Sequence, residues 1–329
     1  MENTLTERCI SEAIQILPSP DDTDYRTIRP YESCYFTSIM LAGHGIETAE
    51  ADTCRPLLLL AGTSIPIDDR LDLIRHFLNA GYEVASIGTA IGGLFDVALN
   101  PRKDRPDSLK HYLKYLIEEV KVNGIDILAQ SYSAFEVLRV LLENPSGYRR
   151  QIKSITFINP PGLNENIGLL KHSFRFIWHH VARGYLKAYR VLSKRTGSSY
   201  DAQQVEFLAR EMRGIKTWTA RTFTNPVRMT REVLDIIAYR IGEPLAVLQN
   251  NYGYDINIFL QSDDQLLPVE ISLARIRGLI PDRNIRVVPG GHNDLFIQEW
   301  QRNALLDFIR ETRARRPLEN SGYESPVIA

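Results

Sequence analysis

The chain has 329 residues, enough for a substantial core, and its 44% hydrophobic and 24% charged residues are typical of a soluble globular protein. A formal net charge of −1 argues against the basic footprint of a nucleic-acid-binding protein. The three cysteines show no CxxC spacing, which indicates free thiols in a reducing compartment. No signal-peptide pattern begins the chain, and no apolar stretch approaches the roughly 20 residues of a membrane span. We therefore expect a cytoplasmic protein without a transmembrane segment.

The beginning of the chain predicts little regular structure. Residues 1–30 are polar and rich in turn-forming residues, and we expect them to form a leader outside the core. Residues 34–41 and 46–51 alternate between apolar and polar side chains on either side of a glycine-containing turn. This pattern predicts an antiparallel pair of strands.

Strands and helices then alternate. Residues 56–61 form an apolar run typical of a buried strand, and a helical pattern over residues 71–78 ends at Gly81. A strand at 82–87, a helix at 108–122, a strand at 125–129, a helix after Ser131 and a strand at 152–158 follow. This order predicts right-handed βαβ units, and hence an α/β fold with a mostly parallel, twisted sheet flanked by helices.

The alternation stops at residues 164–250, where only helical periodicity is found. The predicted helices there are residues 169–192, 202–212, 229–241 and 244–250. Strands at 257–260 and 284–288 and helices at 269–279 and 294–313 then resume the alternation. We expect a core of residues 31–163 and 251–313, an inserted helical cap at 164–250 and a flexible tail at 314–329.

Three residue types needed for nucleophilic catalysis follow one another at predicted strand ends. Ser131 lies where a strand turns into a helix, a tight corner that would expose its hydroxyl. Asp264 lies in the loop after residues 257–260, and His292 lies in a Gly-Gly-His loop before the last helix. A serine hydroxyl needs such a base and such an orienting acid to become a nucleophile.

The order Ser131, Asp264, His292 and the histidine loop resemble the α/β-hydrolase superfamily, in the form that carries a lid. The resemblance covers roughly residues 34–310. It implies a Ser-His-Asp triad, with Asp263 as the alternative acid. The elbow reads Ala129-Gln130-Ser131-Tyr132-Ser133, with alanine and serine at the family's two glycine positions. From Ser133 to Glu136 the sequence fits a capping box, so we expect Ser133 to cap the helix.

The resemblance also implies an oxyanion hole of two backbone N–H groups. One belongs to Tyr132, after the nucleophile, and the other to Thr63, with Ser64 as the next candidate, in the loop after residues 56–61. No dinucleotide-binding or phosphate-loop pattern is present, and the histidines lack metal-site spacing, so we expect no cofactor and no metal.

These features predict a serine hydrolase that cleaves a carboxylic ester or a thioester through an acyl-enzyme. Residues 163–250 contain 14 Lys/Arg and 7 Asp/Glu. This positive excess is compatible with an anionic or carrier-bound small-molecule acyl substrate, and equally with a solvated helical face. The alternatives are a carbon–carbon bond hydrolase, an acyltransferase or a lyase of the same fold, or a non-catalytic ligand-binding protein. The sequence does not indicate an oligomeric state.

Overall fold

The computed structural model describes nine stretches of the chain, and every structural statement below concerns them. They are residues 14–17, 25–28, 38–42, 56–62, 70–88, 124–163, 234, 238–264 and 266–315. The predicted strand at 46–51, the predicted helices at 108–122, 169–192 and 202–212, and residues 316–329 of the predicted tail lie outside this part of the chain.

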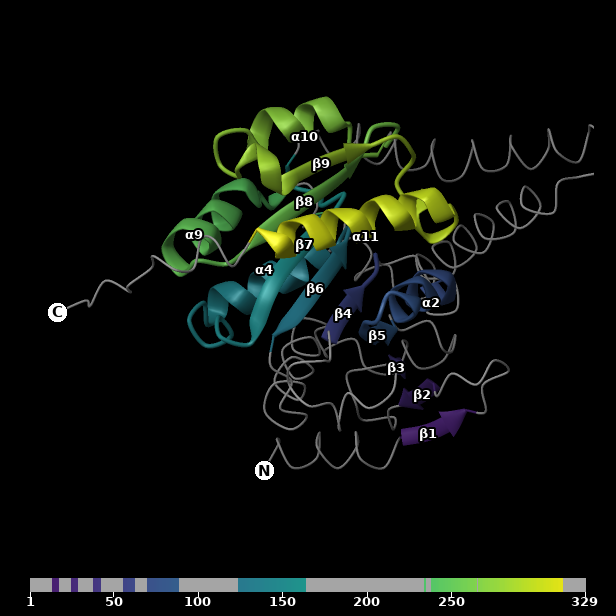
Figure 1. The fold of residues 1–329 in the computed structure, drawn as a ribbon. Coiled ribbons are helices and arrows are strands. Elements are labelled where there is room, and N and C mark those ends of the chain that lie inside the picture. The colour runs from purple at the N-terminus through teal and green to yellow at the C-terminus, as the bar shows by residue number, and fades with distance from the viewer. Residues whose placement is uncertain are drawn as a thin grey trace, which may run out of the picture.

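A nine-stranded sheet organises the described residues, in the order β1-β2-β3-β5-β4-β6-β7-β8-β9 (Figure 1). The six strands from β5 to β9 along this order pair in parallel, whereas β1, β2 and β3 pair antiparallel, as does β3 with β5. The parallel strands are β4 (Pro56–Leu60), β5 (Glu83–Gly88), β6 (Ile125–Gln130), β7 (Ile152–Ile158), β8 (Ile256–Gln261) and β9 (Ile285–Val288). The prediction of a mostly parallel α/β sheet is therefore confirmed.

The antiparallel edge of the sheet corrects the prediction for the first 30 residues. Strands β1 (Ile14–Leu17) and β2 (Tyr25–Ile28) fall within the predicted leader, and β3 is Ser38–Ala42. Both early strands are only four residues long and are flanked by prolines and aspartates, so the turn-rich composition around them outweighs their own short apolar pattern. The described partners of β3 are β2 and β5.

Helices cover both faces of the sheet because alternate residues of each buried strand point to opposite sides. Helices α4 (Ser133–Glu143), α9 (Gly242–Tyr252) and α10 (Val269–Ile276) pack on one face. Helices α2 (Leu71–Asn79) and α11 (Glu299–Ala314) pack on the other. The helices predicted at 71–78, 269–279 and 294–313 are thus present as α2, α10 and α11. A short 3₁₀ turn, η4 (Asp294–Phe296), precedes α11, and another, η3 (Asp282–Asn284), precedes β9.

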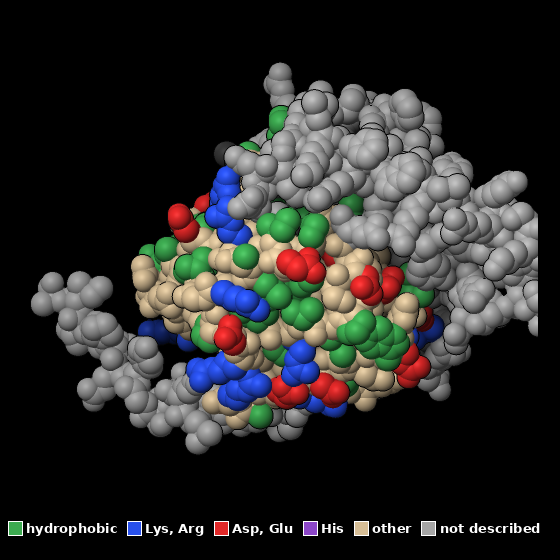
Figure 2. Space-filling model, turned by 90° about the horizontal axis from the view of Figure 1, so that it is seen from above, with side chains coloured by type: hydrophobic (Ala, Val, Ile, Leu, Met, Phe, Trp, Pro, Cys, Tyr) green, Lys and Arg blue, Asp and Glu red, His purple; other side chains and the backbone are tan. Residues whose placement is uncertain are grey.

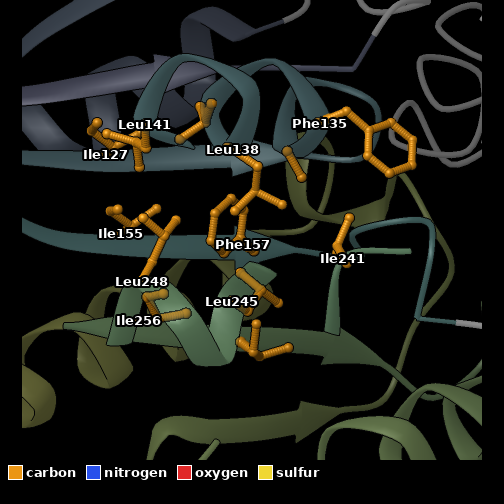
Figure 3. Close-up of a cluster of buried hydrophobic side chains, with 14 of the residues drawn as sticks. Ile127, Phe135, Leu138, Leu141, Ile155, Phe157, Ile241, Leu245, Leu248 and Ile256 are labelled. Atoms are coloured by element: carbon orange, nitrogen blue, oxygen red, sulfur yellow. The ribbon is translucent and has the colours of Figure 1, made fainter. Parts of the chain in front are cut away.

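The core on the α4 side corrects one domain boundary. Helix α9 was assigned to the cap, but Leu245 and Leu248 are fully buried in the same cluster as the strands β6, β7 and β8. Figure 3 shows the side chains of α4 and α9 pointing onto these strands. Because α9 packs beside α4 on the same strands, it belongs to the α/β core. Of the predicted helix at 229–241, only Leu234 and Ala238 are described as helical.

The described surface carries both signs of charge. On the face shown in Figure 2, basic and acidic side chains lie interspersed, with small groups of hydrophobic side chains between them. None of the helices in the described ranges is long and apolar enough to cross a bilayer.

Candidate active site

Ser131 occupies a sharp turn between β6 and α4. Its φ angle is +56°, in the left-handed region that non-glycine residues rarely adopt. The turn is held by a hydrogen bond from the Ser131 amide to the carbonyl of Ile158 on β7 (2.9 Å), and the amide of Ala134 binds the carbonyl of Ser131 (3.0 Å). A strained backbone angle persists only where its surroundings determine it, and such angles cluster at functional sites.

Ser133 fixes the same corner, but not as the predicted cap. The residue before the helix is Tyr132, which makes no side-chain capping hydrogen bond. The Ser133 hydroxyl lies 2.8 Å from the carbonyl oxygen of Gln130 and 2.9 Å from that of Leu60, between which it shares its proton. The helix begins at Ser133 itself, so this side chain lies against the sheet and cannot reach forward to the helical amides. The capping-box prediction was wrong because it placed the helix start one residue too late.

The structure brings Ser131, His292 and Asp264 together, although 161 residues separate the first two. The His292 Nε2 atom lies 2.9 Å from the Ser131 hydroxyl oxygen, and Nδ1 lies 2.6 Å from Asp264 Oδ2. His292 and Asp264 are 7% and 3% exposed. A carboxylate can only accept, so Nδ1 carries the imidazole proton and Nε2 is left to accept the serine proton.

The two neighbouring aspartates have different partners. The second oxygen of Asp264, Oδ1, accepts the amides of Leu266 (2.9 Å) and Leu267 (3.0 Å), which fixes the carboxylate against the histidine. Asp263 instead accepts the amide of Gly290 (3.0 Å), and its own amide binds the carbonyl of Gly290 (2.9 Å). Asp263 thus ties the β8 loop to the histidine loop and does not contact the imidazole.

The loop after β4 lies against Ser131. The Gly62 amide donates to the side-chain oxygen of Gln130 (2.7 Å), and a Cβ atom added at Gly62 would lie 3.1 Å from the Ser131 Cβ. Only a glycine allows this close approach of the loop backbone to the serine. Thr63 lies outside the described residues. Tyr132 directly follows the serine at the start of α4, with its ring edge-on to Phe135.

Buried carboxamides surround the strand ends, and the sequence reading missed them. Gln130 ends β6, Asn159 follows β7, Gln261 ends β8, and Gln301 lies on α11; all four are 2% exposed or less. Asn159 also has a positive φ of 43°. A polar residue that ends an otherwise apolar strand is the sequence signal that could have found the first three, because such side chains meet at one edge of a parallel sheet.

Within the described ranges, no group of three or more His, Cys, Asp or Glu side chains is arranged to hold a metal ion.

Neither a protein-family model nor a curated protein matches the chain. Solved structures do match over most of its length. A structure from the carboxylesterases of the thaumarchaeon Nitrososphaera gargenis shares 15% identity and a TM-score of 0.53, covering 91% of this chain and 99% of its own. An alpha/beta hydrolase enzyme from a sediment metagenome of the Mar Chica lagoon shares 14% identity and a TM-score of 0.53, covering 84% and 95%. The chain has the α/β-hydrolase fold. The chain is also similar to a membrane phospholipase A described as a bacterial virulence factor, with 14% identity and a TM-score of 0.55. The match covers 95% of this chain and 91% of the phospholipase.

Proposed function

We propose that the protein is a serine hydrolase that cleaves a carboxylic ester or a thioester through an acyl-enzyme. The observation that carries the proposal is the continuous contact from Asp264 through His292 to Ser131, at 2.6 and 2.9 Å, on a serine with a left-handed backbone. Hydrogen-bond contact between nucleophile and base, with the base oriented by an acid, is the arrangement that activates a serine.

The contacts support a proposed role for each group. His292 Nε2 takes the hydroxyl proton as the Ser131 oxygen attacks the acyl carbon, and it then returns this proton to the departing alcohol or thiol. A water molecule, deprotonated by the same nitrogen, attacks the acyl-enzyme, and the proton goes back to Ser131 as the carboxylic acid leaves. Asp264 holds the tautomer and stabilises the imidazolium, since both of its oxygens are fixed by hydrogen bonds.

The oxyanion would lie between the start of α4 and the loop after β4. The Tyr132 amide, next to the nucleophile at the helix N-terminus, is the first proposed donor. The Gly62 amide is directed to Gln130 and away from this role, so the second proposed donor is the next one along the loop, Thr63. Removing one such donor typically costs about 2.7–4 kcal/mol of transition-state stabilisation.

The proposed substrate is a small acyl compound, in keeping with the carboxylesterase and the phospholipase A among the structures of the same fold. We propose that the segment from residue 164 to the start of α9, whose sequence predicts helices, forms a lid over Ser131 and shapes the acyl pocket. Its excess of basic residues suits an anionic or carrier-bound acyl group. The odd number of cysteines and the absence of CxxC spacing favour a reducing, cytoplasmic compartment.

Labelling with a fluorophosphonate probe tests the proposal. The probe reacts with an activated serine, so the wild-type protein should be labelled and Ser131→Ala should not. Ser146→Ala is the matched control, because Ser146 is an exposed serine in the connection between α4 and β7, which leads to the amino end of the sheet. This control should keep its label.

Absence of labelling in folded wild-type protein would contradict the hydrolase and favour the non-catalytic ligand-binding alternative. Labelling that survives in Ser131→Ala would mean that another residue is the nucleophile. A positive result should be followed by a screen of acyl esters and thioesters of different chain lengths. Product analysis in that screen separates hydrolysis from acyl transfer, lyase chemistry and carbon–carbon cleavage within the same fold.

A further inference from the structure

Gln130 connects two loops that approach Ser131 from different parts of the chain. Its side-chain oxygen accepts the amide of Gly62 (2.7 Å), and its side-chain nitrogen donates to the carbonyl of His292 (3.2 Å) and to Asn293 Oδ1 (3.1 Å). The side chain is 1% exposed, so solvent cannot replace these bonds. One carboxamide therefore touches the loop after β4 and the main chain of the proposed base.

The histidine loop has a second support at the same atom. Asn159 Nδ2 lies 3.4 Å from the His292 carbonyl oxygen and 2.5 Å from Gln261 Oε1, and Asn159 Oδ1 accepts the amide of Gln261 (2.9 Å). This support is longer than the bond from Gln130, and it holds only the histidine side of the site.

The far end of the loop is held by the next carboxamides in the series. Gln261 donates to Gln301 on α11, and Gln301 in turn donates to the carbonyl of Pro289 (2.9 Å), just before the glycine pair. The loop from Pro289 to His292 is thus bound at both ends to neutral amide side chains. Of these side chains, Gln130 also contacts the Gly62 amide in the loop after β4.

We propose that Gln130 is a positioning residue that sets the distance between the His292 imidazole, the Ser131 hydroxyl and the backbone donors of the loop after β4. The inference rests on the proposed function and deepens it. Gln130 does not touch the reacting atoms; it acts through the backbone of Gly62 and through the backbone carbonyl of His292.

The chemistry of the contacts explains why a glutamine is needed. The Gly62 amide requires an acceptor, whereas the His292 carbonyl and Asn293 Oδ1 both require a donor. Methionine has nearly the same length but supplies neither group. An ionised glutamate supplies the acceptor but opposes two further acceptors, and it adds a negative charge beside the proposed base.

The test compares Gln130→Met with the wild-type protein in two assays. The first is the second-order rate of fluorophosphonate labelling, and the second is kcat and KM for p-nitrophenyl butyrate. Misplacement of a reacting group by about 1 Å can cost roughly 100-fold, so we expect the labelling rate and kcat to fall between about 10- and 100-fold, with KM within about threefold. Gln249→Met on α9, a half-buried glutamine in a helix away from the strand ends, is the matched control and should keep both rates.

Equal labelling rates for Gln130→Met and wild type would overturn the inference while leaving the proposed function intact. Absence of labelling in the wild type would instead overturn the proposed function. The two failures are therefore distinguishable. A parallel fall in rate for Gln249→Met would also overturn the inference, because the effect would then be general.

Gln130→Glu provides a second test if the methionine variant does not fold. A protonated glutamic acid can donate one hydrogen bond to the His292 carbonyl, whereas the carboxylate cannot. The labelling rate of Gln130→Glu relative to wild type should therefore be highest at acidic pH and fall as the pH rises. A ratio that stays constant over the pH range in which both proteins remain folded would contradict the positioning role.

Discussion

The two ends of the parallel strands carry buried polar groups of different kinds. At the amino end, Asp126 of β6 accepts the Ser154 hydroxyl (2.6 Å) and forms an ion pair with Arg313 near the end of α11. The Arg313 guanidinium also lies over the Tyr82 ring, 5.4 Å from its centre. At the carboxyl end, the corresponding position of β6 is Gln130, whose partners are main-chain groups of two loops and the side chain of Asn293.

The difference shows what each end has to hold. The charged contact at the amino end connects α11 to the sheet, at the edge opposite the proposed catalytic residues. In the proposed mechanism, the carboxyl end holds loop backbones beside an imidazole that gains and loses charge. Neutral carboxamides can do so without adding a fixed charge that would favour one protonation state of the base. We therefore expect changes at the carboxyl end to affect the rate first and changes at the amino end to affect stability first.

The largest effect is expected for Asp264→Asn. An asparagine of the same shape no longer holds Nδ1 protonated, and the loss of an orienting aspartate in a serine triad lowers kcat by about 10,000-fold. Asp263→Asn is the control, since Asp263 contacts the Gly290 amide and not the imidazole. Steady-state kinetics with a p-nitrophenyl ester measures both. A larger loss of kcat in Asp263→Asn than in Asp264→Asn would mean that Asp263, and not Asp264, is the orienting acid.

Gly290→Ala should affect both stability and rate. Gly290 has a φ of 126°, and an added Cβ would lie 1.8 Å from the side-chain nitrogen of Gln301. Backbone strain and overpacking together should lower the free energy of unfolding by about 2–4 kcal/mol. Urea denaturation measures this change. Gly278→Ala isolates the backbone part, because Gly278 has a φ of 80° and no atom lies within 4 Å of the added group. Equal losses in the two variants would show that the contact with Gln301 is unimportant.

Asp126→Asn should change stability without changing the rate. The substitution leaves the Arg313 guanidinium facing a neutral group, while an asparagine can still accept from Ser154. Leaving a buried polar group without its full partner costs about 1–3 kcal/mol, at the lower end here because Arg313 is 24% exposed. Chemical denaturation should show this loss with kcat within twofold of wild type. A tenfold fall in kcat would remove the distinction between the two ends of the sheet.

The smallest effect is expected at His76 on α2, on the side of the sheet covered by α11. Burial, and then the positive charge of Arg302, lower the pKa of His76 below its ordinary 6.5. The unfolded chain therefore binds this proton at a higher pH than the folded protein does. The contribution of His76 to stability is present above pH 6.5 and is lost as the pH falls from 6.5 to the lowered value. Denaturation curves at several pH values should show that the free energy of unfolding changes less with pH in His76→Gln than in the wild type. An equal pH dependence in the two proteins would contradict this assignment.

The sequence predicted those parts of the fold that rest on local pattern. The strands β4 to β9 and the helices α2, α10 and α11 follow from apolar runs and helical spacing, and Ser131, Asp264 and His292 followed from their places after strands. The partner of β3 could not be read from local alternation, because strand pairing depends on contacts between distant segments. The prediction that Ser133 caps the helix was wrong for a related reason. Its hydroxyl finds the β4 carbonyl of Leu60, which is 73 residues away.

The carboxamide contacts were beyond local pattern for the same reason. Gln130 and Gly62 are 68 residues apart, and Gln130 and His292 are 162 apart. Glutamine, glycine and histidine all occur commonly in loops, so the contacts between them become visible only when the strand ends meet. Asn159 resembles an ordinary turn residue in the sequence, and its positive φ and double contact with Gln261 are tertiary features.

The most direct measurement of the central claim is the mass of the protein quenched with acid shortly after mixing with p-nitrophenyl butyrate, followed by mapping of the modified peptide. The account predicts one butyryl group, on the hydroxyl of Ser131, which forms quickly in the wild type and far more slowly in His292→Ala. A butyryl group on any other residue would contradict it. So would turnover of the ester by a protein whose mass hydroxylamine does not change and which carries no butyryl group on Ser131.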